Sequence, residues 1–89
     1  MEQEKTAMLA VSLAGHDKGT MYVVLSREDD MLVLADGKNK LLERPKRKKE
    51  KHVQIIKQLP EEIKKQIWLI VRDEDIRRVL KLYKTSREQ

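Results

Sequence analysis

The sequence predicts a mainly β domain followed by a short C-terminal helical appendage. Short apolar segments of strand composition recur at roughly ten-residue spacing up to Ile56, with polar or glycine-containing turns between them. Beyond Leu59 the apolar residues change to helical spacing. With 89 residues, the chain has room for one modest core. We therefore expect a small antiparallel barrel over residues 1–57, and helices over residues 58–89 that pack on it.

Five segments have the composition of β-strands. They are residues 7–13, 20–26, 31–35, 38–43 and 52–56. The fourth is expected to turn its two leucines toward the core. Pro45 then interrupts the ladder, and the charged residues 46–51 are expected to lie outside the sheet.

The C-terminal part contains two helix starts. A proline followed by two glutamates at 60–62 suits the first turn of a helix, and two isoleucines four residues apart then share one face. Asp73 is the predicted N-cap of a second helix. Its apolar face is formed by Ile76, Val79, Leu80 and Tyr83. Lys81 and Lys84 are interpreted as partners of the helix dipole.

The positive charge of the chain is concentrated in one stretch. Residues 38–51 contain eight Lys or Arg and two Glu, a local balance of +6 against a formal net charge of +5. A single basic patch is typical of proteins that bind polyanions. No apolar helix face accompanies it, as membrane anchoring would require. RNA binding is therefore favoured over a solvated loop that only confers solubility.

The sequence offers no support for a membrane-bound or secreted protein. The N-terminal segment lacks the apolar core of a signal peptide, and the longest apolar runs have five residues, far below the ~20 needed to span a bilayer. The chain has no cysteine, which excludes disulfides and thiolate chemistry. We expect a soluble, cytoplasmic protein.

Titratable residues do not form a catalytic or metal-binding pattern. His16 and His52 are far apart in the sequence, and neither has a carboxylate at ligand spacing. The acidic groups at 29–30 and 73–75 have ordinary roles in a turn and a helix start. The chain is therefore not expected to be an enzyme or to hold a metal or cofactor.

Three short motifs occur in a specific order. They are Ala14-Gly15-His16-Asp17-Lys18-Gly19, Ala35-Asp36-Gly37-Lys38 and Lys51-His52-Val53-Gln54. In this order they resemble the bacterial KOW-domain RNA-binding proteins, which are similar to KOW-class large-subunit ribosomal proteins of archaea and eukaryotes. The resemblance runs from about Leu9 to Ile56 and matches Gly19 to the glycine that marks the KOW motif. It implies an SH3-like barrel, RNA binding and ribosomal association, although His16 replaces an expected arginine.

The predicted function is therefore non-catalytic binding of structured RNA by a monomer. Ribosomal RNA is the expected partner, with ribosomal proteins as further partners. The candidate RNA-binding residues are Gly15, His16, Lys18 and Gly19 in the loop, and Lys38, Lys40, Arg44, Lys46, Arg47, Lys48, Lys49, Lys51 and His52 in a basic arm over residues 38–52. The arm is expected to supply most of the attraction. For the loop glycines, a purely conformational role is an equal alternative.

A protein-interaction module is the alternative function. SH3-like barrels also bind peptides, and an exposed basic arm suits an acidic partner in the transcription or translation machinery. The aromatic residues do not favour recognition of unstacked bases, because Trp68 and Tyr83 lie among apolar residues at helical spacing and Tyr22 lies inside a strand. All three are expected to pack in the core.

Overall fold

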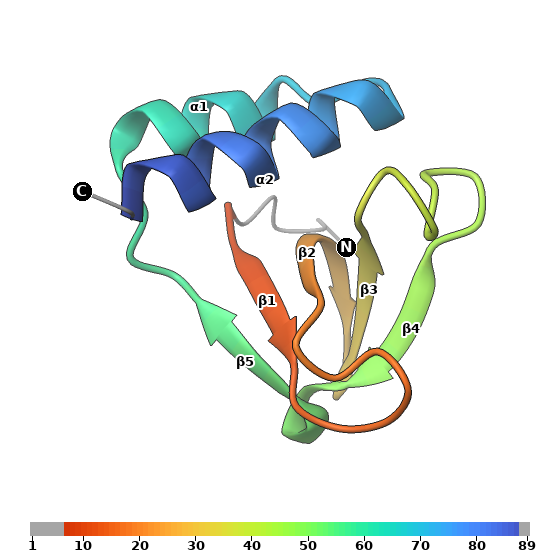
Figure 1. Cartoon of the computed structure of the whole chain (residues 1–89). Helices are drawn as coiled ribbons and strands as arrows, with labels where there is room; N and C mark the ends of the chain where they lie inside the picture. The colour runs from red at the N-terminus through yellow and green to blue at the C-terminus, as the bar shows by residue number, and fades with distance from the viewer. Residues whose placement is uncertain (1–6, 88–89) are drawn as a thin grey trace.

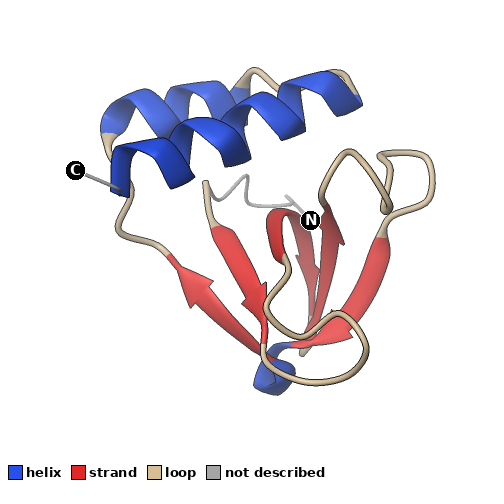
Figure 2. Ribbon diagram, viewed as in Figure 1, coloured by secondary structure: helices blue, strands red, loops and turns tan. Residues whose placement is uncertain are grey.

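A computed structural model describes residues 7–87 of the chain. One antiparallel sheet has five strands in the order β4-β3-β2-β1-β5, and two helices lie side by side across one end of it (Figures 1 and 2). The elements are β1 (Leu9–Ser12), β2 (Met21–Glu28), β3 (Met31–Ala35), β4 (Lys46–Lys49), the short 3₁₀ helix η1 (Glu50–His52), β5 (Val53–Ile56), α1 (Glu61–Trp68) and α2 (Asp73–Arg87). The prediction of a mainly β domain with a C-terminal helix is confirmed.

The central strands are buried on both faces, because successive residues alternate between two apolar clusters. Leu9 and Val23 belong to the cluster that includes the helices. Ala10, Tyr22 and Val24 belong to the other cluster, on the concave face of the sheet. The sheet curls toward this second face, so that edge strand β4 contacts the loop that follows β1. Burial on both faces explains why β2 is almost continuously apolar at its start.

The helices supply much of the core that a small sheet lacks. Ile63 and Ile67 of α1 share one cluster with sheet residues. The remaining helix residues of this cluster are Ile76, Val79, Leu80 and Tyr83 of α2. Full burial of such a side chain stabilises a fold by about 1.5–3 kcal/mol. The apolar stripe read from the sequence is thus the face that packs on the sheet.

The segment between β3 and β5 differs from the prediction in two ways. Residues 38–43 form turns and one isolated bridge between Leu41 and Arg44, so the predicted fourth strand is wrong. The fourth strand is instead Lys46–Lys49, which was expected to lie outside the sheet. It pairs with β3 and begins directly after Pro45. A charged segment can form this strand because it lies at the edge of the sheet, where proline at the entrance is also tolerated.

The Asp36-Gly37 turn docks on the start of α2. The Oδ1 atom of Asp36 accepts the backbone N–H groups of residues 38–40 at 3.0, 2.9 and 2.8 Å. Gly37 has φ +74°, and a Cβ at this position would lie 2.4 Å from the carbonyl oxygen of Asp73. The carboxylate of Asp73 also accepts the N–H group of Leu42 at 2.8 Å. The close approach of two backbones therefore requires glycine here.

The cap of α2 is formed by a different aspartate from the predicted one. The helix begins at Asp73, so this residue is not the N-cap. The carboxylate of Asp75 instead accepts the N–H groups of Val71 and Arg72 at 3.1 and 3.0 Å, as the third residue of a helix does in a capping box. These hydrogen bonds lower the pKa of Asp75 below its ordinary value.

The aromatic residues divide between the core and the surface. Tyr22 and Tyr83 are buried, as predicted. Trp68 is about half exposed, so its predicted core position is wrong. Ile63 and Ile67 define the buried stripe of α1, and Trp68, one residue further along, points away from that stripe. Within residues 7–87, no helix is long and apolar enough to cross a membrane.

Candidate nucleic-acid interface

The carboxylate of Asp17 is the centre of a polar cluster at one end of the curled sheet. It accepts hydrogen bonds from the Ser12 hydroxyl at 2.9 Å and from the Tyr22 hydroxyl at 2.6 Å. The ammonium groups of Lys48 and Lys46 lie 2.8 and 2.9 Å from its two oxygens. We call these five residues the Asp17 cluster. It ties the loop after β1 to strands β1, β2 and β4.

The alternation of side chains along β4 explains this arrangement. Lys46 and Lys48 pair with leucines of β3 that belong to the concave cluster, so their side chains point to the same face. Only 28% and 11% of their side-chain surfaces are exposed. Arg47 and Lys49 point to the opposite face and are exposed. The sequence run of four cations is thus divided between two surfaces.

The proton equilibria of the Asp17 cluster follow from burial and pairing. Burial alone raises the pKa of Asp17, but hydrogen bonds from Lys48, Tyr22, Lys46 and Ser12 outweigh it and hold that pKa far below its ordinary value. Burial, together with the hydrogen bond to Asp17 and its charge, raises the pKa of the Tyr22 phenol. Asp17 is therefore ionised, and its charge neutralises much of the positive charge of two neighbouring lysines.

The glycines of the Gly15–Gly19 loop serve its conformation. Both have φ +89°. The N–H groups of residues 18–20 donate to carbonyl oxygens within or beside the loop at 3.2, 2.8 and 2.9 Å. These donors are consumed inside the protein, so the loop does not offer them to a phosphate. Its side chains His16 and Lys18 remain exposed.

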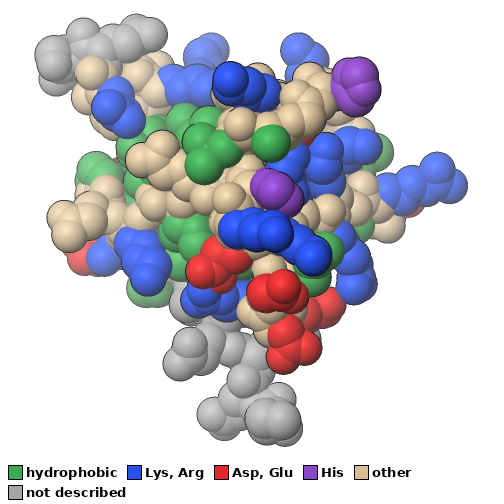
Figure 3. Space-filling model, turned by 90° about the horizontal axis from the view of Figure 1, so that it is seen from below, with side chains coloured by type: hydrophobic (Ala, Val, Ile, Leu, Met, Phe, Trp, Pro, Cys, Tyr) green, Lys and Arg blue, Asp and Glu red, His purple; other side chains and the backbone are tan. Residues whose placement is uncertain are grey.

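The loop and η1 together form one end of the molecule. The N–H group of Leu13 donates to the carbonyl oxygen of His52 at 2.8 Å, which joins the two segments. Figure 3 looks onto this end and shows both histidines of the chain among Lys and Arg side chains, with acidic side chains gathered at one side. Lys51 and His52 are exposed here. Four predicted site residues, the two histidines with Lys18 and Lys51, thus lie on two segments that are hydrogen-bonded to each other.

The acidic side of this end balances three cations of the predicted arm, Arg47, Lys49 and Lys51. A shallow depression there is lined by Arg27, Asp29, Asp30, Lys49, Glu50 and Lys51. Arg27 pairs with Glu50, and Arg47 pairs with Glu28 at 2.9 Å. Cations and carboxylates occur in equal numbers around the depression. This side therefore has no excess of positive charge.

A second group of cations lines a groove beside α2. We call it the α2 groove, and its lining residues are Gly19, Thr20, Met21, Asp36, Lys38, Arg77, Leu80, Lys81, Lys84 and Thr85. Among the residues that the structure describes, no carboxylate forms an ion pair with Lys38, Lys81 or Lys84. Asp36 is the one acidic residue of the lining, and its Oδ1 already accepts three N–H groups. The groove therefore has a clear excess of positive charge.

The α2 groove combines predicted and unpredicted residues. Gly19 and Lys38 meet there, although the sequence placed them in separate motifs. Lys40 and Arg44 lie in the turns before β4 and do not line it. Sequence reasoning missed the three basic residues of α2, at positions 77, 81 and 84. Their i, i+4, i+7 spacing on one helix face was the signal that could have found them.

The described residues do not form a recognisable metal site. Across residues 7–87, no group of three or more His, Cys, Asp or Glu side chains is placed to hold a metal ion. Comparison with protein-family models found no match, and comparison with curated proteins found none either. The function is therefore inferred from the geometry and charge of the chain itself.

Proposed function

We propose that this protein is a non-catalytic RNA-binding protein whose α2 groove and Gly15–Gly19 loop contact the phosphate backbone. The observation that carries the proposal is the α2 groove. Four cations line this groove: Lys38 from the turn after β3, and the three basic residues of α2 at positions 77, 81 and 84. They lie beside Gly19, and the one carboxylate of the lining, that of Asp36, already accepts three backbone N–H groups. Phosphates need exposed cationic donors of this kind, and release of condensed counterions strengthens their binding.

The finer fold assignment is part of the same proposal. We assign the curled sheet to the SH3-like barrel that the KOW resemblance implies. Two features support this assignment: the meander of β1, β2, β3 and β4 in the strand order, and the single 3₁₀ helix that joins the two edge strands β4 and β5. The ribosomal partner follows from this resemblance, and the expected cytoplasmic setting follows from the lack of a signal-peptide pattern in the sequence.

Structured RNA is the preferred ligand. The α2 groove has no aromatic side chain in its lining, so it offers no platform on which unstacked bases could stack. Lysines projecting from a rigid helix instead suit the backbone of a folded RNA, which proteins recognise largely by shape and by phosphate contacts. Ribosomal RNA is the structured RNA that the KOW resemblance implies.

The test is the salt dependence of RNA binding. Fluorescence anisotropy would follow the binding of a labelled RNA hairpin at increasing KCl concentration. Neutralising two groove lysines in Lys81→Gln/Lys84→Gln should weaken binding by about tenfold and reduce the slope of log affinity against log salt by about 2. The matched control is Lys57→Gln/Lys65→Gln, which removes the same charge from exposed residues outside the groove. Equal slopes for both variants would show that the α2 groove is not the interface.

A further inference from the structure

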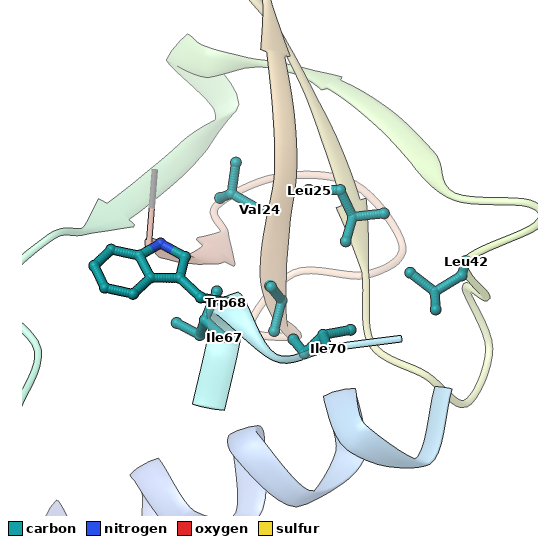
Figure 4. Close-up of a pocket in the computed structure, with 7 residues that line it drawn as sticks. Val24, Leu25, Leu42, Ile67, Trp68 and Ile70 are labelled. Atoms are coloured by element: carbon teal, nitrogen blue, oxygen red, sulfur yellow. The ribbon is translucent and has the colours of Figure 1, made fainter. Parts of the chain in front are cut away.

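The connection between α1 and α2 exposes an apolar surface. The exposed fractions of Trp68, Leu69 and Val71 are 49%, 68% and 76%. A cavity of about 140 Å³ lies beside them and is lined only by apolar residues, namely Val23, Val24, Leu25, Leu42, Ile67, Trp68 and Ile70 (Figure 4). We call this cavity together with Leu69 and Val71 the Trp68 surface. Apolar residues this exposed in a contiguous chain segment are typical of an interaction site.

A β-bulge contributes to the cavity. The pairing of β2 with β3 shifts between Val24 and Ser26, so Leu25 is the extra residue of the bulge. Leu25 and Leu42 line one side of the cavity, while the end of α1 lines the other. An apolar cavity of about 150 Å³ is large enough to admit benzene. The cavity therefore has room for one leucine-sized or aromatic side chain.

The charges beside the cavity favour an acidic ligand. Trp68 also lines a neighbouring depression with Ala7, Met8, Arg27, Lys57, Glu61 and Lys64. Lys64 lies 3.7 Å from Glu61, and Arg27 is paired with Glu50. For Lys57, the described part of the chain supplies no carboxylate at ion-pair distance. With Glu50 counted, three cations against two carboxylates leave one positive charge in excess on this rim, at Lys57, which complements a negatively charged partner.

We propose that the Trp68 surface binds an acidic segment of a protein partner. One leucine-sized or aromatic side chain of the partner enters the cavity, and a carboxylate of the partner lies beside Lys57. A nucleic acid fits this surface poorly, because the side chains that line the cavity carry no hydrogen-bonding group for the edge of a base except the indole N–H of Trp68. The Trp68 surface and the α2 groove share no lining residue, so RNA and the protein partner can be bound together.

The fluorescence of Trp68 provides the test, because it is the only tryptophan of the chain. The probe is a short synthetic peptide of glutamate and serine with one central leucine. The full chain is expected to show a saturable blue shift of Trp68 emission on titration. Replacing the central leucine by serine, or the glutamates by lysine, should weaken binding by at least about tenfold. A peptide that produces no shift at millimolar concentration would overturn the proposal.

Matched variants separate the surface from general effects. Lys57→Glu should weaken peptide binding by about tenfold, whereas Lys65→Glu, an exposed change on α1 outside both depressions, should not. Leu69→Ser should weaken it, whereas Leu82→Ser, an equally apolar exposed position on α2, should not. Equal effects within either pair would contradict the assignment of the site.

Other occupants give distinguishable results. If an oligouridylate, rather than the peptide, quenches Trp68, the residue stacks on bases and the proposal is wrong. If the full chain does not bind the peptide, but a chain without residues 1–6 binds it and has a shifted Trp68 emission, the chain's own N-terminal segment occupies the surface. If emission changes with protein concentration alone, a second copy occupies it. Each of these results overturns the proposal, and a peptide response without them supports it.

Discussion

The Asp17 cluster and the α2 groove use the same residue type for opposite purposes. Lys46 and Lys48 are largely buried, and both pair with a single ionised carboxylate. Lys38, Lys81 and Lys84 are exposed and line a groove whose one carboxylate is occupied by backbone N–H groups. The difference teaches that a lysine-rich run is not by itself a binding surface. The face to which each side chain points decides whether its charge stabilises the fold or remains available to a ligand.

The energetic consequences of the two regions differ accordingly. Removing one partner of a buried ion pair leaves the other charge without compensation, which typically costs about 3–5 kcal/mol, a large part of the roughly 5–15 kcal/mol total stability of a folded protein. Neutralising an exposed lysine usually changes stability by less than about 0.5 kcal/mol. Stability measurements should therefore respond to the Asp17 cluster, and RNA-binding measurements to the α2 groove.

The largest effect is expected for Asp17→Asn. The variant leaves two lysines without their carboxylate and should lower the free energy of unfolding by about 3 kcal/mol at neutral pH, measured by urea denaturation. The control is Asp29→Asn, which changes an exposed aspartate of the β2–β3 hairpin. If the two variants unfold at the same urea concentration, the Asp17 cluster does not stabilise the fold.

The same variant has a defined pH dependence. The pKa of Asp17 is lowered in the folded state, so its contribution to stability is fully present above the ordinary value near 3.9 and is lost as the pH falls toward the folded-state pKa. The difference in stability between the natural protein and Asp17→Asn should therefore narrow as the pH is lowered from about 5 to about 2. A difference that stays constant over this range would contradict the depressed pKa.

A smaller effect on stability is expected for Lys48→Met, and it separates the two regions directly. Methionine keeps much of the apolar stem but removes the hydrogen bonds to Asp17 and to the Ala14 carbonyl oxygen. Stability should fall by about 2 kcal/mol. The salt dependence of RNA binding should stay unchanged, because this charge is already paired inside the protein. A reduced slope of log affinity against log salt would mean that Lys48 contacts phosphate, so that the Asp17 cluster also belongs to the RNA interface.

The smallest effect is expected for Lys49→Gln/Lys51→Gln. These lysines line the depression in which cations and carboxylates occur in equal numbers. Their removal should weaken RNA binding by only about twofold, against about tenfold for the matched double variant in the α2 groove. An effect as large as that of Lys81→Gln/Lys84→Gln would move the interface to the end of the molecule that carries η1.

Local sequence patterns were sufficient to predict most of the elements. The segments that became β1, β2, β3 and β5 combine β-branched or apolar residues with flanking turn residues, and the helical spacing after Leu59 identified the buried stripes of α1 and α2. The glycines at positions 15, 19 and 37 marked the loop after β1 and the turn after β3, and all three have positive φ. These features depend on interactions between near neighbours, so they can be read from composition and period.

Tertiary structure decided which basic residues are available to a ligand. Lys48 and Asp17 are 31 positions apart, and only the curl of the sheet and the register of β4 against β3 bring them into contact. In the same way, the docking of α2 on the Asp36-Gly37 turn places the helix lysines beside Lys38. The sequence determined how much positive charge the chain carries and in which segments. Which groups these charges pair with depends on strand register, because a shift of one residue turns each side chain of β4 to the opposite face.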